Sequence, residues 1–226
     1  PDACEGDLND SPQQGPVMSA VSSTPMQPAE PATLRALRPA LQFAPELLLK
    51  AQGIRLAIFD VDGVLTDGRL HYTAEGEQLK VFNVLDGHGL KLLAQAGIVP
   101  AIVTGRDSPA LRRRLADLGV AHAVYGASDK LHATRALLAE LGRHWHEVAV
   151  IGDDWPDLPL MQRAQFVAAP AQAHADVRAV ADHVTTAAGG RGAAREFCDL
   201  LLTACGRYSV LLHGTTRTLD AGAPAA

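Results

Sequence analysis

The chain has 226 residues, of which 47% are hydrophobic, and a formal net charge of -5 at pH 7, so it holds enough apolar material for one globular domain. The acidic balance argues against a basic surface for binding nucleic acid. The sequence contains no run of 18 or more apolar residues, so it does not predict a membrane span. The N-terminus also lacks the pattern of a signal peptide, so we expect a cytoplasmic protein.

The two ends of the chain differ in composition from its middle. Residues 1–40 are rich in Pro, Ser, Gln and Ala and lack apolar periodicity. Such a segment cannot bury enough surface to offset the entropy that it loses on ordering. We therefore predict a disordered N-terminal extension over 1–40 and a flexible C-terminal tail over 214–226, with the folded domain over 41–213.

Between these ends, short apolar runs alternate with helical patterns. Gly, Pro or polar residues bound each run, as expected for strands that are buried on both faces of a sheet. Leucines at helical spacing separate the runs. This alternation predicts an α/β fold, a doubly wound Rossmann-like parallel sheet with helices on both faces. The five predicted strands are 54–59, 98–104, 120–126, 147–152 and 165–170.

One stretch breaks the alternation. Residues 69–82, RLHYTAEGEQLKVF, hold two short strand-like pieces around Gly76, where a glycine can adopt the positive φ of a tight turn. We predict a β-hairpin over 69–82 that projects from the end of the sheet.

Polar residues gather where the predicted strands end. In open α/β sheets, ligands bind beyond the carboxyl ends of the strands, so residues that follow different strands can converge on one site. The residues at these ends are Asp60 and Asp62 after the first strand, Thr104, Gly105 and Arg106 after the second, Lys130 at a helix start after the third, and Asp153 and Asp154 after the fourth.

These residue types suit phosphate chemistry. Three nearby carboxylates, Asp60, Asp62 and Asp153, would raise each other's pKa values unless a cation neutralised them, and Mg²⁺ prefers such oxygen ligands. Beside the ion, the Thr104 hydroxyl, backbone N–H groups and Lys130 form a cradle for phosphate. The set supports phosphoryl transfer, with one Asp as nucleophile and the Asp two residues on as general acid and base.

The segments DVDGVLTDG, TGR and GDDWPDLPLM, with the lone Lys130 before the last, resemble the four signature segments of the haloacid dehalogenase superfamily in its phosphatase form. The resemblance covers roughly residues 54–205. It implies that Asp60 is the nucleophile and that Asp62 is the general acid and base. The other implied roles are phosphate binding by Thr104, Gly105 and Lys130, Mg²⁺ binding by Asp60, Asp153 and the main-chain carbonyl of Asp62, and orientation of Lys130 or a metal-bound water by Asp154.

Neither gap between these segments has room for a cap domain, because only the hairpin fills the first. The segments GRLHYTAEGEQLKVFNVLDGHGLKLL and GGRGAAREFCDLLL resemble the capless phosphatases of eight- and nine-carbon 2-keto sugar acid phosphates. The resemblance implies a homotetramer joined through the hairpins, with the C-terminal segment near an adjacent site. Its implied substrate-binding residues are Arg106, Gly189, Gly190 and Arg195.

The function that the resemblance implies is Mg²⁺-dependent hydrolysis of a phosphorylated 2-keto-3-deoxy sugar acid, 3-deoxy-D-manno-octulosonate 8-phosphate, through an aspartyl-phosphate, in lipopolysaccharide synthesis. Nine-carbon 9-phosphates are an alternative, because nothing in the catalytic residues separates the two chain lengths. A receiver-like signalling module is an alternative of another class, since receivers also combine acids, Mg²⁺, a hydroxyl and a lysine. Receivers lack an acid two residues after the phosphorylated Asp, so Asp62 favours turnover.

Other polar residues have simpler interpretations. Asp67 and Asp86 suit turns or helix caps, and Asp157 suits a cap or a supporting position better than direct metal binding. Arg195 could instead form an ion pair with Glu196 on a solvated helix face.

Overall fold

The computed structural model describes residues 37–220 of the chain. Six strands form one sheet in the order β5-β4-β1-β6-β7-β8, and all neighbours are parallel. The chain moves outward from β1 to β5 and then returns to place β6 on the other side of β1, so the switch point lies between β1 and β6. The strands are β1 (Leu56–Phe59), β4 (Val99–Val103), β5 (His122–Val124), β6 (Val148–Ile151), β7 (Phe166–Ala169) and β8 (His183–Val184).

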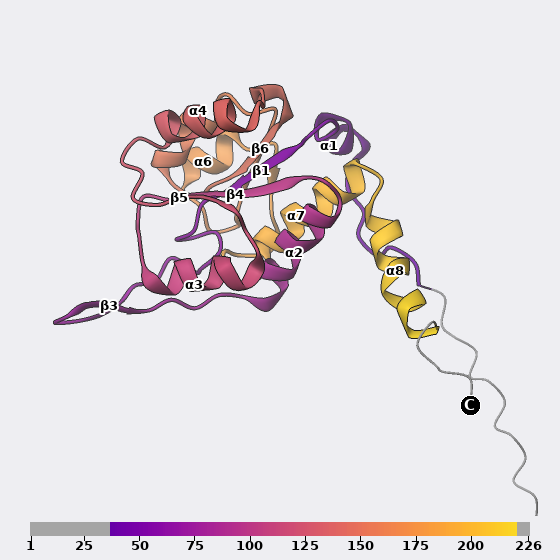
Figure 1. Ribbon diagram of the computed structural model, residues 1–226. Coiled ribbons are helices and arrows are strands. Elements are labelled where there is room, and N and C mark those ends of the chain that lie inside the picture. The colour runs from indigo at the N-terminus through magenta and orange to yellow at the C-terminus, as the bar shows by residue number, and fades with distance from the viewer. Residues whose placement is uncertain (1–36, 221–226) are drawn as a thin grey trace, which may run out of the picture. The chain divides into compact units, whose positions relative to one another are not determined.

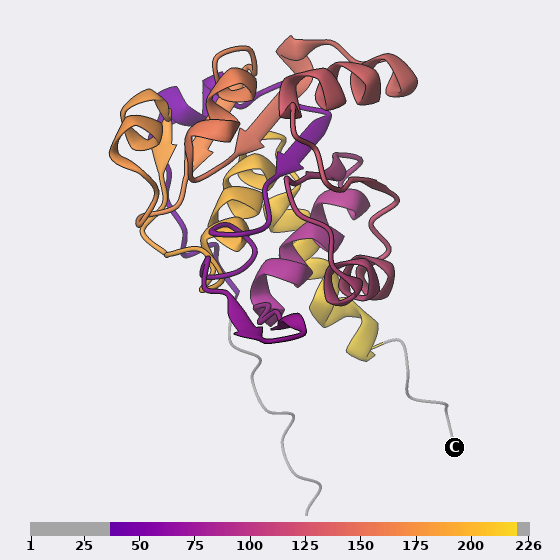
Figure 2. The ribbon, with the colours of Figure 1, turned by 90° about the vertical axis from the view of Figure 1, so that its left-hand side faces the viewer.

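Helices cover both faces of this sheet. Helices α4 and α6 lie on one face, and α2, α3 and α7 lie on the other (Figure 1), and the turned view shows the same two layers (Figure 2). The doubly wound fold predicted from the sequence is therefore confirmed. The helices are α1 (Pro45–Lys50), α2 (Val84–Gln95), α3 (Pro109–Leu118), α4 (Lys130–Leu141), α5 (Leu158–Met161), α6 (Ala175–Val180), α7 (Ala193–Ala204) and α8 (Tyr208–Asp220).

Strand β1 shows why the apolar runs are continuous. Its side chains alternate between two cores: Ala57 and Phe59 pack with α2, α3 and α7, whereas Leu56 and Ile58 pack with α4, α5 and α6. All four residues are at most 1% exposed. Because both faces are covered, no position of the strand can be polar until the strand ends.

The predicted hairpin is also present. Strands β2 (His71–Thr73) and β3 (Gly76–Leu79) pair antiparallel in a separate two-stranded sheet, and Gly76 adopts a φ of 109° at the turn. The hairpin projects away from the six-stranded sheet (Figure 1). In the described part of the chain, only this hairpin and α2 stand between β1 and β4, so no cap domain is inserted there.

Some boundaries differ from the prediction. The five predicted strands are present with one or two residues fewer at most ends, and the two-residue β8 was missed because it is too short to show a pattern. The flexible C-terminal tail was expected to begin at residue 214, but helix α8 continues to Asp220. Residues 37–40 are exposed and form neither helix nor strand, and the rest of the predicted N-terminal extension lies outside the described residues. None of the described helices is long and apolar enough to cross a membrane.

Helix α7 is capped by a residue of another helix. Its own N-cap residue is Gly192, which has no side chain to offer. Instead, the carboxylate of Asp86 on α2 accepts hydrogen bonds from the backbone nitrogens of Gly192 (3.3 Å) and Arg195 (2.8 Å). Asp86 was expected to be a turn or cap residue, but α2 itself is capped by Asn83, which accepts from Leu85 N. The close packing of α2 on α7 therefore includes a buried polar connection.

Replacing Asp86 tests this cap. Asp86→Ala leaves buried N–H groups without an acceptor, so we expect the free energy of unfolding to fall by about 1–3 kcal/mol. Burial raises the pKa of Asp86, so its charge is costly, and Asp86→Asn, which keeps an acceptor oxygen, should lose less. Urea unfolding measures both, with Asp117→Ala on the exposed face of α3 as control. An Asp86→Ala protein as stable as the control would contradict the cap.

Candidate active site

The strand ends converge on one cavity of about 460 Å³ at the carboxyl edge of the sheet. Asp60 follows β1 and Asp153 follows β6, so the two acids flank the switch point of the sheet. Most of the residues that the sequence pattern singled out line this cavity. They are Asp60, Asp62, Thr104, Gly105, Arg106, Lys130, Asp153 and Asp154, and Asp157 joins them.

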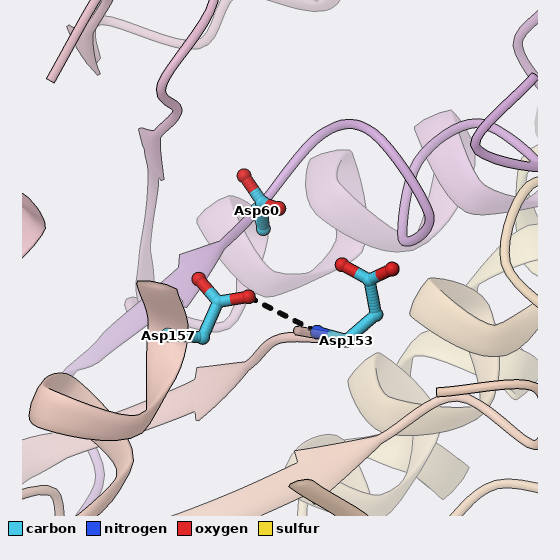
Figure 3. Close-up of side chains that lie close together, drawn as sticks. All are labelled: Asp60, Asp153 and Asp157. Carbon is cyan, nitrogen blue, oxygen red and sulfur yellow. Dashed lines mark hydrogen bonds between the residues drawn. The ribbon is translucent and has the colours of Figure 1, made fainter. Parts of the chain in front are cut away.

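Three of these acids form a tight cluster. Carboxylate oxygens of Asp60, Asp153 and Asp157 lie within 4.8 Å of one another (Figure 3). Burial, with the charge of Asp157, raises the pKa of Asp60 to about 6, although Lys130 opposes the shift. Burial, with the charges of Asp60 and Asp157, raises the pKa of Asp153 to about 7. The cluster therefore carries more negative charge than the nearby protein groups neutralise, as expected for a cation site.

Lys130 joins two of the acids. It is the first residue of α4, and its Nζ lies 2.7 Å from Asp60 Oδ1 and 2.7 Å from Asp157 Oδ1. Burial acts to lower the pKa of Lys130, but the charges of Asp60 and Asp157 outweigh it and raise that pKa, so the ammonium group is retained. Asp157 is in turn held by Asp153 N, which donates to Asp157 Oδ2 at 3.1 Å (Figure 3).

Asp154 has a local contact in the structure. Its Oδ1 accepts a hydrogen bond from Trp155 N at 2.8 Å and caps the 3-10 turn Trp155–Asp157. Orientation of a metal-bound water by Asp154 stays a prediction, whereas Lys130 is held by another acid. Asp157 holds Lys130 instead, which fits the supporting position expected for it. Both oxygens of Asp157 already have partners, so Asp60 and Asp153 are the better carboxylate ligands for an ion.

Two glycines make room for the carboxylates. Gly63 adopts a φ of 90°, and a Cβ at this position would lie 1.9 Å from Asp153 Oδ2. A Cβ at Gly152 would lie 2.4 Å from the Cβ of Asp157. Any side chain at either position would displace an acid of the cluster. The donor set, the space around it and its uncompensated charge all fit a hard divalent cation.

Thr104 directly follows β4, lines the same cavity as Lys130, and is 1% exposed. Its Oγ1 accepts a hydrogen bond from Arg106 N at 3.3 Å, which leaves the hydroxyl hydrogen for another acceptor. The adjacent Gly105 lines the same wall. The cavity thus offers a hydroxyl donor and an ammonium group beside Asp60, which is the chemistry expected of a phosphate cradle.

The general acid predicted at Asp62 is tied to the hairpin. Lys80 Nζ lies 2.5 Å from Asp62 Oδ1 and 2.9 Å from Glu77 Oε1. Arg106 lies on the other side, with Nε 3.6 Å from Asp62 Oδ2 and Nη2 3.1 Å from Glu77 Oε2. It also donates to the hydroxyl of Tyr72 at 2.9 Å. Neither Lys80 nor Glu77 was singled out from the sequence, because no signature segment contains them.

The C-terminal glycines support the loop after β1. Gly189 N donates to Gln172 Oε1 at 2.8 Å, and Gly190 N donates to Val64 O at 2.9 Å. A Cβ at Gly189 would lie 1.8 Å from Gly63 O, so the two segments approach as closely as glycine allows. Within this chain these glycines are not among the described residues that line the cavity.

Arg195 also lies away from the cavity of its own chain. Its Nε is 2.8 Å from Asp199 Oδ1, one turn along α7. The alternative pairing with Glu196 is wrong, because Glu196 accepts from Thr186 N and lies 2.9 Å from His183 Nε2. Substrate binding by Gly189, Gly190 and Arg195 at the site of a neighbouring subunit stays a prediction.

Comparison with known proteins gives first a class and then a family. A sequence model described as haloacid dehalogenase-like hydrolase matches residues 124–197, which include Lys130 and the acids after β6. The chain is 46% identical over 164 residues to the 3-deoxy-D-manno-octulosonate 8-phosphate phosphatase of Salmonella typhimurium, a match that covers 73% of this chain and 87% of that relative.

Solved structures agree with this match. A probable YrbI family phosphatase from Pseudomonas syringae has a TM-score of 0.75 at 44% identity, over 76% of this chain and 98% of that one. A second structure is the 3-deoxy-D-manno-octulosonate 8-phosphate phosphatase of Moraxella catarrhalis, solved with a magnesium ion, a phosphate ion and a KDO molecule. It has a TM-score of 0.73 at 42% identity, and the match covers 75% of this chain and 98% of that one. The chain belongs to the 3-deoxy-D-manno-octulosonate 8-phosphate phosphatase family of haloacid dehalogenase-like hydrolases.

The raised pKa values predict how metal binding depends on pH. In the metal-free protein, Asp60 and Asp153 hold protons below about 6 and 7, and both must lose them to bind an ion. Mg²⁺ affinity, measured by isothermal titration calorimetry, should therefore rise from pH 5.5 to pH 8. The same groups stabilise the metal-free fold at low pH and cease to do so as pH rises through 6 to 7. Stabilisation by Mg²⁺ should grow accordingly.

The Asp153→Asn variant is the control for this pH dependence. It removes one proposed ligand and the group with the higher pKa, so it should bind Mg²⁺ weakly at every pH. An affinity of the unmodified protein that stays constant from pH 5.5 to pH 8 would contradict the assignment of the cluster.

Proposed function

We propose that the protein is a Mg²⁺-dependent phosphatase that releases phosphate from 3-deoxy-D-manno-octulosonate 8-phosphate. The observation that carries the proposal is the buried Asp60 at the end of β1, in contact with Lys130 and beside Asp153 and Asp157. Relatives that are 46% identical to this chain over the aligned residues are named for the same activity. The nine-carbon alternative has no such support, and a phosphatase family argues against a receiver-like module.

The first step forms an aspartyl-phosphate on Asp60. A carboxylate oxygen of Asp60 attacks phosphorus, and the bond between phosphorus and the sugar oxygen breaks. Asp62 gives a proton to that oxygen, so the sugar acid leaves as an alcohol. Lys130 and the Thr104 hydroxyl bind phosphate oxygens and neutralise the charge that moves onto them.

The second step restores Asp60. Asp62, now ionised, takes a proton from a water molecule, whose oxygen attacks phosphorus and displaces the Asp60 carboxylate. Inorganic phosphate leaves, and both acids return to their starting states. When bound, Mg²⁺ would be held by Asp60, Asp153 and the main-chain carbonyl of Asp62, and it would offset the negative charge of acids and phosphate together.

Phosphate release tests the reaction and its substrate together. The measurement compares 3-deoxy-D-manno-octulosonate 8-phosphate with nine-carbon keto-acid phosphates and hexose phosphates, with Mg²⁺ and with EDTA. Asp60→Asn should fold normally and lose at least about 10³-fold in kcat, because the nucleophile is gone. Lys130→Ala should lose about 10²–10³-fold.

Asp107→Asn is the matched control, since Asp107 is exposed and pairs with Arg112 outside the cavity. It should keep its activity. Equal rates on all substrates would contradict the eight-carbon specificity, and normal activity of Asp60→Asn would contradict the nucleophile.

The hairpin supports a homotetramer. Apolar side chains that would normally be buried are exposed along it and at the start of α2. A second copy that covered them would also close the capless cavity from one side. A place in lipopolysaccharide synthesis, and a cytoplasmic location, go with the proposed substrate. The exposed apolar residues are Leu70, Tyr72, Leu79, Val81, Val84 and Leu85.

Charged substitutions on this surface test the oligomer. The unmodified protein should have the mass of a tetramer by light scattering, and Leu79→Asp with Val81→Asp should give smaller species because the charges would be desolvated at the interface. Val180→Asp, at another exposed apolar site, on α6, is the control. A monomeric unmodified protein would contradict the proposal.

A further inference from the structure

The segment that leaves the hairpin, from the last residue of β3 to Val81, has an inverted pattern of burial. Leu79 and Val81 are 53% and 58% exposed, whereas the side chain of Lys80, between them, is only 3% exposed. A solvated strand end normally presents its lysine to water and its apolar neighbours to the protein. Burying an ammonium group costs free energy unless strong partners compensate it, so this orientation needs a reason.

The partners of Lys80 supply that reason. Its Nζ contacts one oxygen of Asp62 and one oxygen of Glu77, so a single cation connects the hairpin to the loop after β1. The two side chains of Asp62 and Glu77 are 20% and 11% exposed, which keeps water from replacing these contacts. Asp62 comes two residues after Asp60, where the loop has left the sheet, and Lys80 is the group that fixes its carboxylate.

The two oxygens of Asp62 differ as a result. Oδ1 is held by Lys80, whereas Oδ2 is buried and accepts no hydrogen bond from the described residues. Arg106 Nε, at 3.6 Å, lies beyond hydrogen-bond distance from Oδ2. Asp62 lines the cavity, and its contact with Lys80 fixes the direction in which its carboxylate faces.

We propose that Lys80 is a positioning residue for Asp62: it holds Oδ1 and so orients the carboxylate toward the oxygen that leaves phosphorus. The proposal rests on the proposed function, because it takes Asp62 as the acid and base. Lys80 touches no reacting atom and acts through Asp62 alone. Glu77 completes the arrangement, since it contacts both Lys80 and Arg106 and so fixes the cation on each side of Asp62.

The test uses the leaving group. A sugar alkoxide needs a proton to depart, whereas p-nitrophenolate is a far weaker base and departs without one. Lys80→Met removes the charge and keeps the length of the side chain. In the first turnover it should slow release of the sugar acid by about 10²-fold, and release of p-nitrophenol from p-nitrophenyl phosphate by no more than about threefold. The KM for the sugar phosphate should change little.

Two further variants complete the experiment. Lys80→Arg keeps a cation in place and should recover most of the lost rate, and it carries the comparison alone if Lys80→Met does not fold. Lys91→Met removes an exposed lysine of α2 and should match the unmodified protein with both substrates.

The outcomes separate the two proposals. Selective loss with the sugar phosphate and recovery in Lys80→Arg support the positioning role. Equal loss with both substrates, or a loss confined to KM, would overturn it while the phosphatase function stands. An unmodified protein that releases product from neither substrate would overturn the proposed function, and the role of Lys80 with it.

Discussion

The repulsion between Asp60, Asp153 and Asp157 is the constraint on which the rest of the site depends. Acids whose oxygens lie within 4.8 Å of one another destabilise the fold unless cations offset them. Lys130 offsets part of this charge, and burial, together with the repulsion that remains, raises the pKa values of Asp60 and Asp153. A divalent ion would neutralise the charge of the acids and that of a phosphate dianion together.

The sheet makes this concentration of charge tolerable. Strands β1 and β6 are adjacent and parallel, so both end at the same edge of the sheet. At that edge the chain is no longer buried between the two helical layers. The acids then sit on loops whose backbone is free to donate to them, as Asp153 N does to Asp157. Gly63 and Gly152 remove the side chains that would otherwise occupy the same space.

The signature residues were predictable from the sequence because each follows an apolar run that only a buried parallel strand explains. Their convergence then follows from topology, so Asp60, Thr104, Lys130 and Asp153 meet as expected. Contacts between segments with no shared pattern were not predictable. Asp86 looks like a local cap and caps α7 instead, and the alternation Leu79-Lys80-Val81 suggests a lysine that points to water. For both Asp86 and Lys80, a partner far away in the chain decides the orientation of the side chain. A single sequence does not show which distant residues become partners.

The hairpin has two faces with opposite requirements. Its inward side carries Glu77 and Lys80, whose charges are matched by Asp62 and Arg106, whereas its outward side carries Leu79 and Val81 without a cover in the described chain. A partner that buries the apolar side would hold the strand, and the strand holds Lys80 against Asp62. Assembly and catalysis would then be linked through one short strand, because a hairpin that loses its partner gains freedom at the residue that orients the acid. A site without a cap domain would thus obtain from a partner copy the support that a cap would otherwise provide.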